Sequence, residues 1–224
     1  DSVCVQTYKD YEVILVDNHS IDDSIEFVEK NYGEKVRIVR NNKNLGFAGG
    51  NNAGIFSAQG EYILLLNNDA WIDPDFLGNI FSFLNENDFD VVAPTETDYE
   101  NKIRNNCSIK IDLLGHPIYL DNTTTQESFY LHGVCLFFKK EFYRETFGFD
   151  DDFFMYFEEV DWFWRLNLLD KKFSFAKDIF VHHAGAGSTG RGVKYSAFLW
   201  RNQNCLQMLL KNYSWYNLCW TIPL

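Results

Sequence analysis

The hydrophobic pattern of the chain centres on a continuous apolar run at residues 62–66, within the sequence EYILLLNND. The run does not alternate, which predicts a strand that is covered on both faces, as in the middle of a parallel sheet. It ends abruptly in Asn67, Asn68 and Asp69. Ligands bind at the carboxyl ends of central strands in open α/β sheets, so these residues predict a ligand site. A plain polar turn would show the same residues.

Strand-like and helix-like segments alternate along the first half of the chain. The expected strands cover 11–16, 35–40, 62–66 and 89–93, and the expected helices cover 1–8, about 20–32, 51–59 and 75–85. Strict alternation is typical of a parallel sheet with helices on both faces. The predicted fold class is therefore α/β.

The alternation breaks at 95–130, a polar segment with weak periodicity. Its length predicts an elaborated loop or a small hairpin beside the site. The pattern then resumes with strands at 131–139 and 173–176 and helices at 140–146, 158–169 and 193–213. Neither an internal repeat nor a linker divides the sequence, so a single domain over 1–224 is expected.

The composition narrows the function classes. The net charge of −12 argues against a non-specific nucleic-acid binder, which needs a basic surface. Aromatic residues make up 17% of the chain, which favours a large aromatic core over sugar-stacking surfaces. Five scattered cysteines without a CxxC pair indicate reduced thiols in a cytoplasmic protein.

The two ends of the sequence look cut. The chain has no initiator Met, no signal peptide and no apolar stretch of about 20 residues. It closes in SWYNLCWTIPL, an aromatic and aliphatic run. We expect a parent protein that continues into a membrane-surface or membrane-buried helix, although a packed core helix would read the same way.

Asp17 and Asn18 follow the first expected strand. A carboxylate at this point can accept hydrogen bonds from a base or a ribose, while an ordinary helix cap is the locally favoured alternative. The glycines at 46–54 could approach phosphates closely, but they do not spell G-x-G-x-x-G, and no P-loop is completed. A dinucleotide-binding fold or an NTPase is therefore poorly supported.

Three acids open the helix expected at 158–169, in the sequence FFMYFEEVDWFWR. Glu158, Glu159 and Asp161 lie in its first turn, where the helix dipole favours the ionised form of Glu158 and Glu159. An ionised carboxylate beside aromatic walls suits a general base that acts on a sugar hydroxyl. Simple complementation of the dipole is the equal alternative.

The same helix carries a structural pattern. Val160, Phe163 and Trp164 share one face, which predicts that this face packs inward. Asp161 and Arg165 stand four positions apart in the favourable order, so we expect them to form an ion pair.

His182 and His183 precede the Gly-rich sequence AGAGSTGRG. One histidine could complete an oxygen-rich metal site, and the loop could close on a diphosphate; a buried structural histidine is the more usual case. Arg191 and Lys194 could meet phosphate charge or face solvent.

Taken together and in this order, these segments resemble family 2 glycosyltransferases of the GT-A fold, and most closely their rhamnosyltransferase-like bacterial branch that builds surface polysaccharides. The resemblance spans nearly the whole chain. Its carriers are QTYKDYEVILVDNHSIDDS, NLGFAGGNNAGI, YILLLNNDAWIDPDFL, LHGVCLFFKKEFYRETFGFDDDFFMYFEEVDWFWRL, and VHHAGAGST with the following YSAFLWRN. It implies a Rossmann-like α/β fold with a mostly parallel central sheet and helices on both faces. It also implies that an N-terminal strand and its polar turn are missing here.

The resemblance also implies roles for individual residues. It implies a donor site at Asp17, Asn18, Asn44, Gly46, Asn68 and Asp69. Asp69 matches the last acid of the family's DxD motif and would hold Mg²⁺ or Mn²⁺, with His183 completing the metal shell. Glu159 matches the general base, and Glu158 and Asp161 are the other catalytic candidates. Asn67 replaces the first acid of DxD, which implies weak metal affinity without the donor.

The implied activity is inverting transfer of a sugar from a dTDP-, UDP- or GDP-sugar to a hydroxyl of a glycan or lipid-linked acceptor, at the inner face of the cell membrane. Two alternatives remain open. One is a catalytically silent scaffold domain that binds carbohydrate or nucleotide. The other is a sugar-phosphate nucleotidyltransferase, which would carry a Gly-rich, basic loop near its N-terminus.

Overall fold

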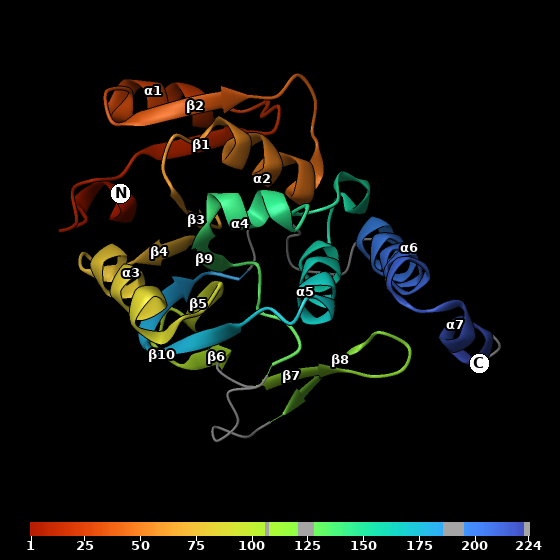
Figure 1. Ribbon diagram of the computed structural model, residues 1–224. Helices are drawn as coiled ribbons and strands as arrows, with labels where there is room; N and C mark the ends of the chain where they lie inside the picture. The colour runs from red at the N-terminus through yellow and green to blue at the C-terminus, as the bar shows by residue number, and fades with distance from the viewer. Residues whose placement is uncertain (106–107, 121–127, 186–194, 222–224) are drawn as a thin grey trace.

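The computed structural model describes residues 1–105, 108–120, 128–185 and 195–221 (Figure 1). The helices are α1 (Ser24–Tyr32), α2 (Gly46–Ser57), α3 (Phe76–Asn87), α4 (Lys140–Glu145), α5 (Glu158–Leu168), α6 (Tyr195–Asn212) and α7 (Trp215–Thr221), with 3-10 turns at Ser2–Val5 and Asp151–Phe153. The strands are β1 (Val13–Asp17), β2 (Val36–Arg40), β3 (Tyr62–Leu66), β4 (Ala70–Ile72), β5 (Val91–Thr97), β6 (Ile103–Asn105), β7 (Ser108–Ile111), β8 (Pro117–Leu120), β9 (Cys135–Lys139) and β10 (Phe173–His183).

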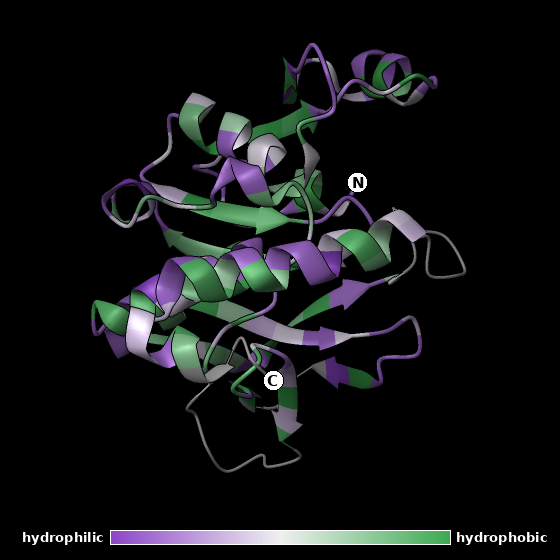
Figure 2. Cartoon of the chain, turned by 90° about the vertical axis from the view of Figure 1, so that its right-hand side faces the viewer, coloured by the Kyte–Doolittle hydropathy of each residue, from purple (hydrophilic) through white to green (hydrophobic). Residues whose placement is uncertain are grey.

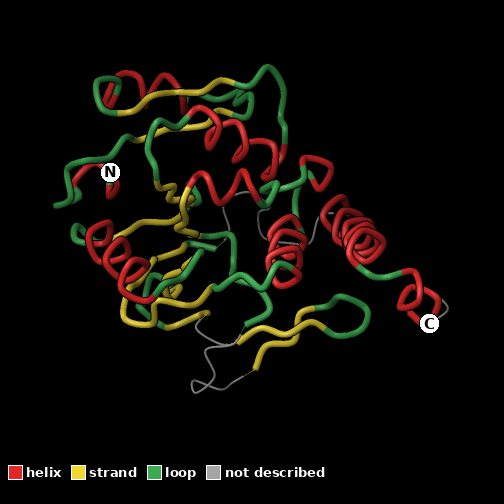
Figure 3. Tube along the Cα trace, viewed as in Figure 1, coloured by secondary structure: helices red, strands yellow, loops and turns green. Residues whose placement is uncertain are grey.

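The central sheet of the described residues has six strands in the order β3-β9-β5-β10-β4, with β6 paired to β5. In Figures 1 and 3, α3 lies to one side of this sheet and α5 and α6 lie to the other. β1 and β2 form a separate parallel pair, and β7 and β8 form an antiparallel hairpin. The predicted α/β class is confirmed, and the hairpin confirms one of the two forms expected for the segment 95–130.

β3 is covered on both faces, as its unbroken apolar run predicts. Ile63 and Leu65 belong to the core cluster that includes side chains of α2, α4 and α5. Leu64 and Leu66 pack instead with the cluster that includes the buried face of α3. Alternate residues of one strand thus pack into two hydrophobic cores. This packing holds the strand rigidly and so fixes the position of the turn that follows it.

The sheet is more mixed than the alternation of the sequence predicts. β1–β2 and β5–β10 are parallel pairs, whereas β9 runs antiparallel to both β3 and β5, and β4 runs antiparallel to β10. β9 enters the sheet after the long excursion that follows β5. A connection of that length lets the chain return in either direction, unlike the short helical crossovers of the first half.

Several expected boundaries are wrong. The expected helix over 1–8 is a 3-10 turn followed by extended chain, and β4 replaces part of a stretch that was expected to be loop. α2 begins at Gly46 instead of residue 51, so the Gly-rich segment is helical. A Cβ atom at Gly50 would lie 2.6 Å from the Asn18 amide nitrogen, so glycine permits α2 to approach β1 closely.

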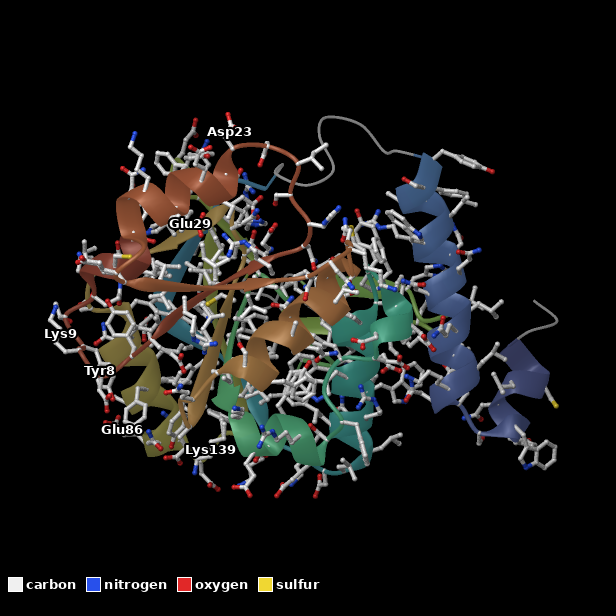
Figure 4. All side chains as sticks on the ribbon, turned by 90° about the horizontal axis from the view of Figure 1, so that it is seen from above. Tyr8, Lys9, Asp23, Glu29, Glu86 and Lys139 are labelled. Carbon is white, nitrogen blue, oxygen red and sulfur yellow. The ribbon has the colours of Figure 1, made fainter. Side chains whose placement is uncertain are left out.

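The aromatic residues build the core, as expected. The ring of Trp162 lies 5.0–5.5 Å from three other buried rings, those of Phe138, Tyr143 and Phe149. Several strands are mostly hydrophobic in Figure 2, while the charged residues Lys9 and Asp23 lie at the outer edge of the view in Figure 4. The predicted inward face of α5 is also confirmed, since Val160, Phe163 and Trp164 are buried.

The described part of the chain contains no helix with the length and apolar character that crossing a bilayer requires. α6 and α7 lie at one edge of the molecule and carry exposed apolar side chains, among them Phe198, Leu210 and Trp215. Contact of this end with a membrane surface stays a prediction.

Candidate functional site

The turn between β3 and β4 places Asp69 beside His183 at the end of β10. The backbone N–H of Ala70 donates to the carbonyl of Asn67 at 3.1 Å, which closes the turn. β4 then pairs with β10, and the N–H of Ala184 donates to the Asp69 carbonyl at 2.9 Å. As a result, His183 Nε2 lies 3.1 Å from Asp69 Oδ1.

Glu96, on β5, holds the other nitrogen of the same imidazole. His183 Nδ1 lies 2.7 Å from Glu96 Oε1, and the Glu96 side chain is buried. A carboxylate at this distance fixes the proton on Nδ1 and turns Nε2 toward Asp69. The hydrogen bond to Glu96 raises the pKa of His183, burial opposes this shift, and Asp69 adds to it.

The pair formed by Asp69 and His183 fits a divalent cation. When the Nδ1–H of a neutral His183 donates to Glu96, its Nε2 turns a lone pair toward the Asp69 carboxylate oxygen. Two lone pairs repel each other, so a proton or a cation must lie between Nε2 and Oδ1. Within the described ranges, no group of three or more His, Cys, Asp or Glu side chains is arranged to hold a metal. A cation here would therefore need further oxygen ligands from a bound diphosphate, a mode typical of Mg²⁺.

His182 points away from Asp69 and His183, and its side chain makes packing and hydrogen-bond contacts within the sheet. Its Nδ1 lies 2.8 Å from Thr97 Oγ1, and its ring stacks on Trp71 with centroids 5.2 Å apart. Successive side chains of a strand face opposite sides of the sheet, so only one histidine of the pair can reach Asp69.

The predicted donor residues gather where β1 meets the start of α2. Asn18 Nδ2 donates to the Gly46 carbonyl at 2.7 Å, and Asn44 Oδ1 accepts from the Gly46 N–H at 2.8 Å. Asp17 is buried, and its Oδ1 accepts from the N–H of Ser20 at 2.8 Å, the contact of a polar turn. The structure brings these residues together, and their role in binding a nucleotide stays a prediction.

The segment that precedes α5 also touches α2. The carbonyl of Phe154 accepts hydrogen bonds from the N–H groups of Phe47 at 2.5 Å and Ala48 at 3.4 Å. It therefore caps the N-terminus of α2, a helix without a side-chain cap. Gly46 has φ +73°, and a Cβ there would lie 2.2 Å from the Phe154 carbonyl, so only glycine fits this contact.

The helix dipole, which was expected to favour the ionised forms of Glu158 and Glu159, is not the dominant influence on their pKa values. Burial raises the pKa of Glu158 well above its usual range, and the neighbouring Glu159 raises it further. Burial also raises the pKa of Glu159, although hydrogen bonds from its own backbone N–H and from Glu158, and then the charge of Arg201, oppose this shift. No described residue hydrogen-bonds to the Oε2 atom of either carboxyl group. Desolvation outweighs the dipole here because the first turn of α5 is buried, not open to water.

Asp161 lies in a different environment from the two glutamates. It is fully buried and accepts hydrogen bonds from Arg165 Nε at 3.1 Å, Lys211 Nζ at 3.1 Å and Asn212 Nδ2 at 2.8 Å. The predicted pair with Arg165 is confirmed, and the group ties α5 to α6. A catalytic role for Asp161 stays a prediction.

Asn68 is exposed in the turn between β3 and β4. The predicted residues Gly187, Ser188, Thr189, Arg191 and Lys194 lie outside the described residues. The roles given to Asp17, Asp69 and Glu159 by the family resemblance require that the three side chains converge on one cleft, and this convergence is a prediction. The sequence does not predict a role for two further residues. Glu96 lies beyond the expected end of its strand, and Asn204 of α6 donates hydrogen bonds to the segment before α5.

The chain is similar in sequence to known glycosyltransferases. The sequence model described as "Glycosyl transferase family 2" matches residues 1–147. A cholesterol galactosyltransferase of Borreliella burgdorferi is 33% identical over 90 residues, which cover 39% of this chain and 25% of that protein. Glycosyltransferase GlyG of Streptococcus pneumoniae is 30% identical over 102 residues, which cover 45% of this chain and 34% of that protein. The matched regions thus span a quarter to a third of these relatives.

Two solved structures share the fold. GalNAc-T7, crystallised with UDP, GalNAc and Mn²⁺, superposes with a TM-score of 0.73 at 14% identity, over 93% of this chain and 44% of that one. TarS 1–349 of S. aureus in complex with UDP superposes with a TM-score of 0.64 at 16% identity, over 95% of this chain and 61% of that one. Both are GT-A glycosyltransferases, so the predicted GT-A fold is confirmed.

Proposed function

Because the chain belongs to glycosyl transferase family 2, we propose that it transfers a sugar from a nucleoside-diphosphate donor to a hydroxyl group of a glycan or lipid-linked acceptor. The observation that carries this proposal is the contact of Asp69 with His183 at the end of a strand buried on both faces. The narrower rhamnosyltransferase-like assignment, surface polysaccharide synthesis and a location at the inner membrane face belong to the same proposal.

The donor would bind where β1 meets α2. Asp17, Asn18 and Asn44 supply oxygen acceptors and an amide donor there, which suit the edges of a base and the hydroxyls of a ribose. Two relatives in fold were solved with UDP, which makes UDP the first nucleotide to test. dTDP and GDP follow it in the same experiment.

Asp69 and His183 would hold Mn²⁺ or Mg²⁺ against the donor diphosphate. When bound, the cation neutralises the charge that develops on the leaving diphosphate. Glu96 keeps the proton of His183 on Nδ1, which leaves Nε2 free to act as a ligand. Two protein ligands alone predict weak binding of the cation until the donor arrives.

Glu159 would act as the general base. Its carboxylate takes the proton of the acceptor hydroxyl while that oxygen bonds to the anomeric carbon; the bond from that carbon to the diphosphate breaks and its electron pair leaves with the nucleoside diphosphate. One displacement of this kind inverts the anomeric centre. Burial raises the pKa of Glu159, which makes its carboxylate a stronger base than an exposed one.

Calorimetry and a transfer assay test the proposal together. The wild-type chain is titrated with UDP, dTDP and GDP, with Mn²⁺ or with EDTA, and a panel of nucleotide sugars is assayed for release of the nucleoside diphosphate. We expect one nucleotide to bind more tightly with Mn²⁺ and its sugar to be transferred. Nucleotide binding without transfer would favour a silent scaffold, and release of pyrophosphate from a nucleoside triphosphate and a sugar phosphate would favour a nucleotidyltransferase.

A further inference from the structure

The segment before α5 is held by hydrogen bonds to its backbone carbonyls. The Asn204 amide of α6 donates to the carbonyls of Phe153 at 2.6 Å, Met155 at 2.9 Å and Tyr156 at 2.8 Å. The intervening carbonyl, that of Phe154, caps α2. Four successive carbonyls therefore point at donors from two helices, and the two N–H groups of one buried amide are shared among three of them.

The shape of this segment needs such support. Phe154, Tyr156 and Phe157 have φ angles of 46°, 73° and 71°, in the left-handed region that non-glycine residues rarely adopt. Residues persist in this region where the surrounding contacts over-determine them, and they cluster at functional sites. Phe157 is also the residue from which α5 begins, so the shape of the segment sets the start of the helix that carries Glu159.

α6 adds two aromatic contacts to the hydrogen bonds of Asn204. The ring of Trp200 lies 4.9 Å from the ring of Phe154, and the Arg201 guanidinium lies 4.9 Å from the centre of the Tyr156 ring. Trp200 and Asn204 are four positions apart, so they share a face of the helix. This face of α6 thus binds the segment through both its backbone and its side chains.

We propose that Asn204 is a positioning residue, whose amide holds residues 153–157 in a shape with positive φ at three of them, and thereby fixes where α5 begins and where Glu159 lies. The inference rests on the proposed function, in which Glu159 is the general base. The same segment caps α2 through Phe154, so Asn204 also sets the position of the base relative to the helix that borders the donor residues. The sequence carries no signal of this role, since a helical asparagine usually faces solvent.

The test compares Asn204→Ala and Asn204→Asp with matched changes at Asn202. Asn202 is exposed on the same helix, and its amide donates to the Phe198 carbonyl within α6. Alanine removes the donor, and aspartate also places acceptors against three carbonyl oxygens. Transfer kinetics, UDP binding with Mn²⁺, and hydrogen exchange of a peptide covering 153–159 are measured below the melting temperature of each variant.

We expect both Asn204 variants to lower kcat by about 10- to 100-fold, because misplacement of a reacting group by about 1 Å has effects of this size. The Kd for UDP should change by less than about twofold, and exchange at 153–159 should accelerate by at least about tenfold. The Asn202 variants should match the wild type in all three measurements.

Two results would overturn the inference. One is a kcat for Asn204→Ala within twofold of that for Asn202→Ala. The other is a parallel loss of kcat and UDP binding, which would indicate a general structural role. If the wild type transfers no sugar, the proposed function fails. Hydrogen exchange then tests the role of Asn204 by itself. Unchanged exchange at 153–159 in Asn204→Ala would show that Asn204 does not hold the segment, and faster exchange would show that it does.

Discussion

His183 Nε2 lies 3.1 Å from Asp69 Oδ1, although 114 positions separate the two residues in the chain. The three residues of β4 make this contact possible, because they pair antiparallel with the end of β10 directly after the turn that carries Asp69. Glu96 then fixes the imidazole from the opposite side at 2.7 Å. The imidazole of His183 thus lies between two carboxylates. Its Nδ1 is occupied by Glu96, so a cation would lie between its Nε2 and Asp69.

Asp69→Asn should abolish cation-dependent binding of the donor. The amide keeps the size of the side chain but removes its negative charge, so transfer should fall by at least about 100-fold. UDP binding should lose its dependence on Mn²⁺ in calorimetry, while the melting temperature should stay within a few degrees of that of the wild type. Asp73→Asn is the control, since Asp73 directly follows β4 and its side chain is 60% exposed. Full activity of Asp69→Asn would reject the assignment.

The sequence predicts Asp69 and His183 as partners through a family resemblance, because each belongs to a recognisable motif. It does not predict Glu96, since β5 continues beyond its last consecutive apolar residue and the register between β5 and β10 depends on a bulge between Ala176 and Phe180. Likewise, the run at 62–66 predicts two-sided burial but not the antiparallel partner β9. Local pattern determines which residues are buried, whereas pairing depends on contacts between distant segments.

Glu96→Gln should weaken binding of the cation without affecting the nucleotide alone. Loss of the carboxylate removes the partner that fixes the tautomer of His183, and such changes typically lower metal affinity by about 10-fold or more. Electron paramagnetic resonance of Mn²⁺, titrated in the presence of UDP, measures this affinity directly. Glu100→Gln is the control, because its side chain is 70% exposed on the same connection from β5 to β6. Equal Mn²⁺ affinity in the two variants would contradict the role given to Glu96.

Glu159→Gln should remove the general base and lower kcat by about 100-fold or more, with UDP binding intact. The pH dependence of the wild type offers a second test. The base must be ionised, and burial raises the pKa of Glu159, so kcat/KM should fall on the acidic side at a pH above the usual glutamate value of about 4.3. An acidic limb at or below that value would contradict a buried base. Glu141→Gln, at an exposed position in α4, is the control for the loss of one carboxylate.

Glu158→Gln tests whether Glu158, whose pKa is raised more strongly than that of Glu159, carries a proton in the folded protein. Burial raises the pKa of Glu158, so the folded state holds this proton at pH values where the unfolded chain has lost it. The resulting stabilisation is complete below the unfolded pKa of about 4.3 and declines as the pH rises toward the raised folded value. Glutamine cannot ionise, so the variant should lose less stability than the wild type between pH 5 and pH 7.5. Urea unfolding at the two pH values measures the difference, and equal losses would contradict a protonated Glu158.

Asp161→Asn separates a structural acid from a catalytic one on the same helix turn. Arg165 and Lys211 donate to the buried Asp161 carboxylate. Its neutral replacement leaves Arg165 without a carboxylate partner, while Lys211 keeps its ion pair with Asp150 at 2.6 Å. Breaking a buried ion pair in this way typically costs about 3–5 kcal/mol of unfolding free energy. The free energy from urea unfolding should therefore fall by about this amount, whereas kcat of the folded variant at low temperature should stay within a few-fold of the wild type. Asp170→Asn, exposed just beyond α5, should change neither. If Asp161→Asn instead lost kcat with its stability intact, Asp161 would belong with Glu159 in the reaction. The hydrogen bonds from Arg165, Lys211 and Asn212 to Asp161 would then not be needed to hold α5 against α6.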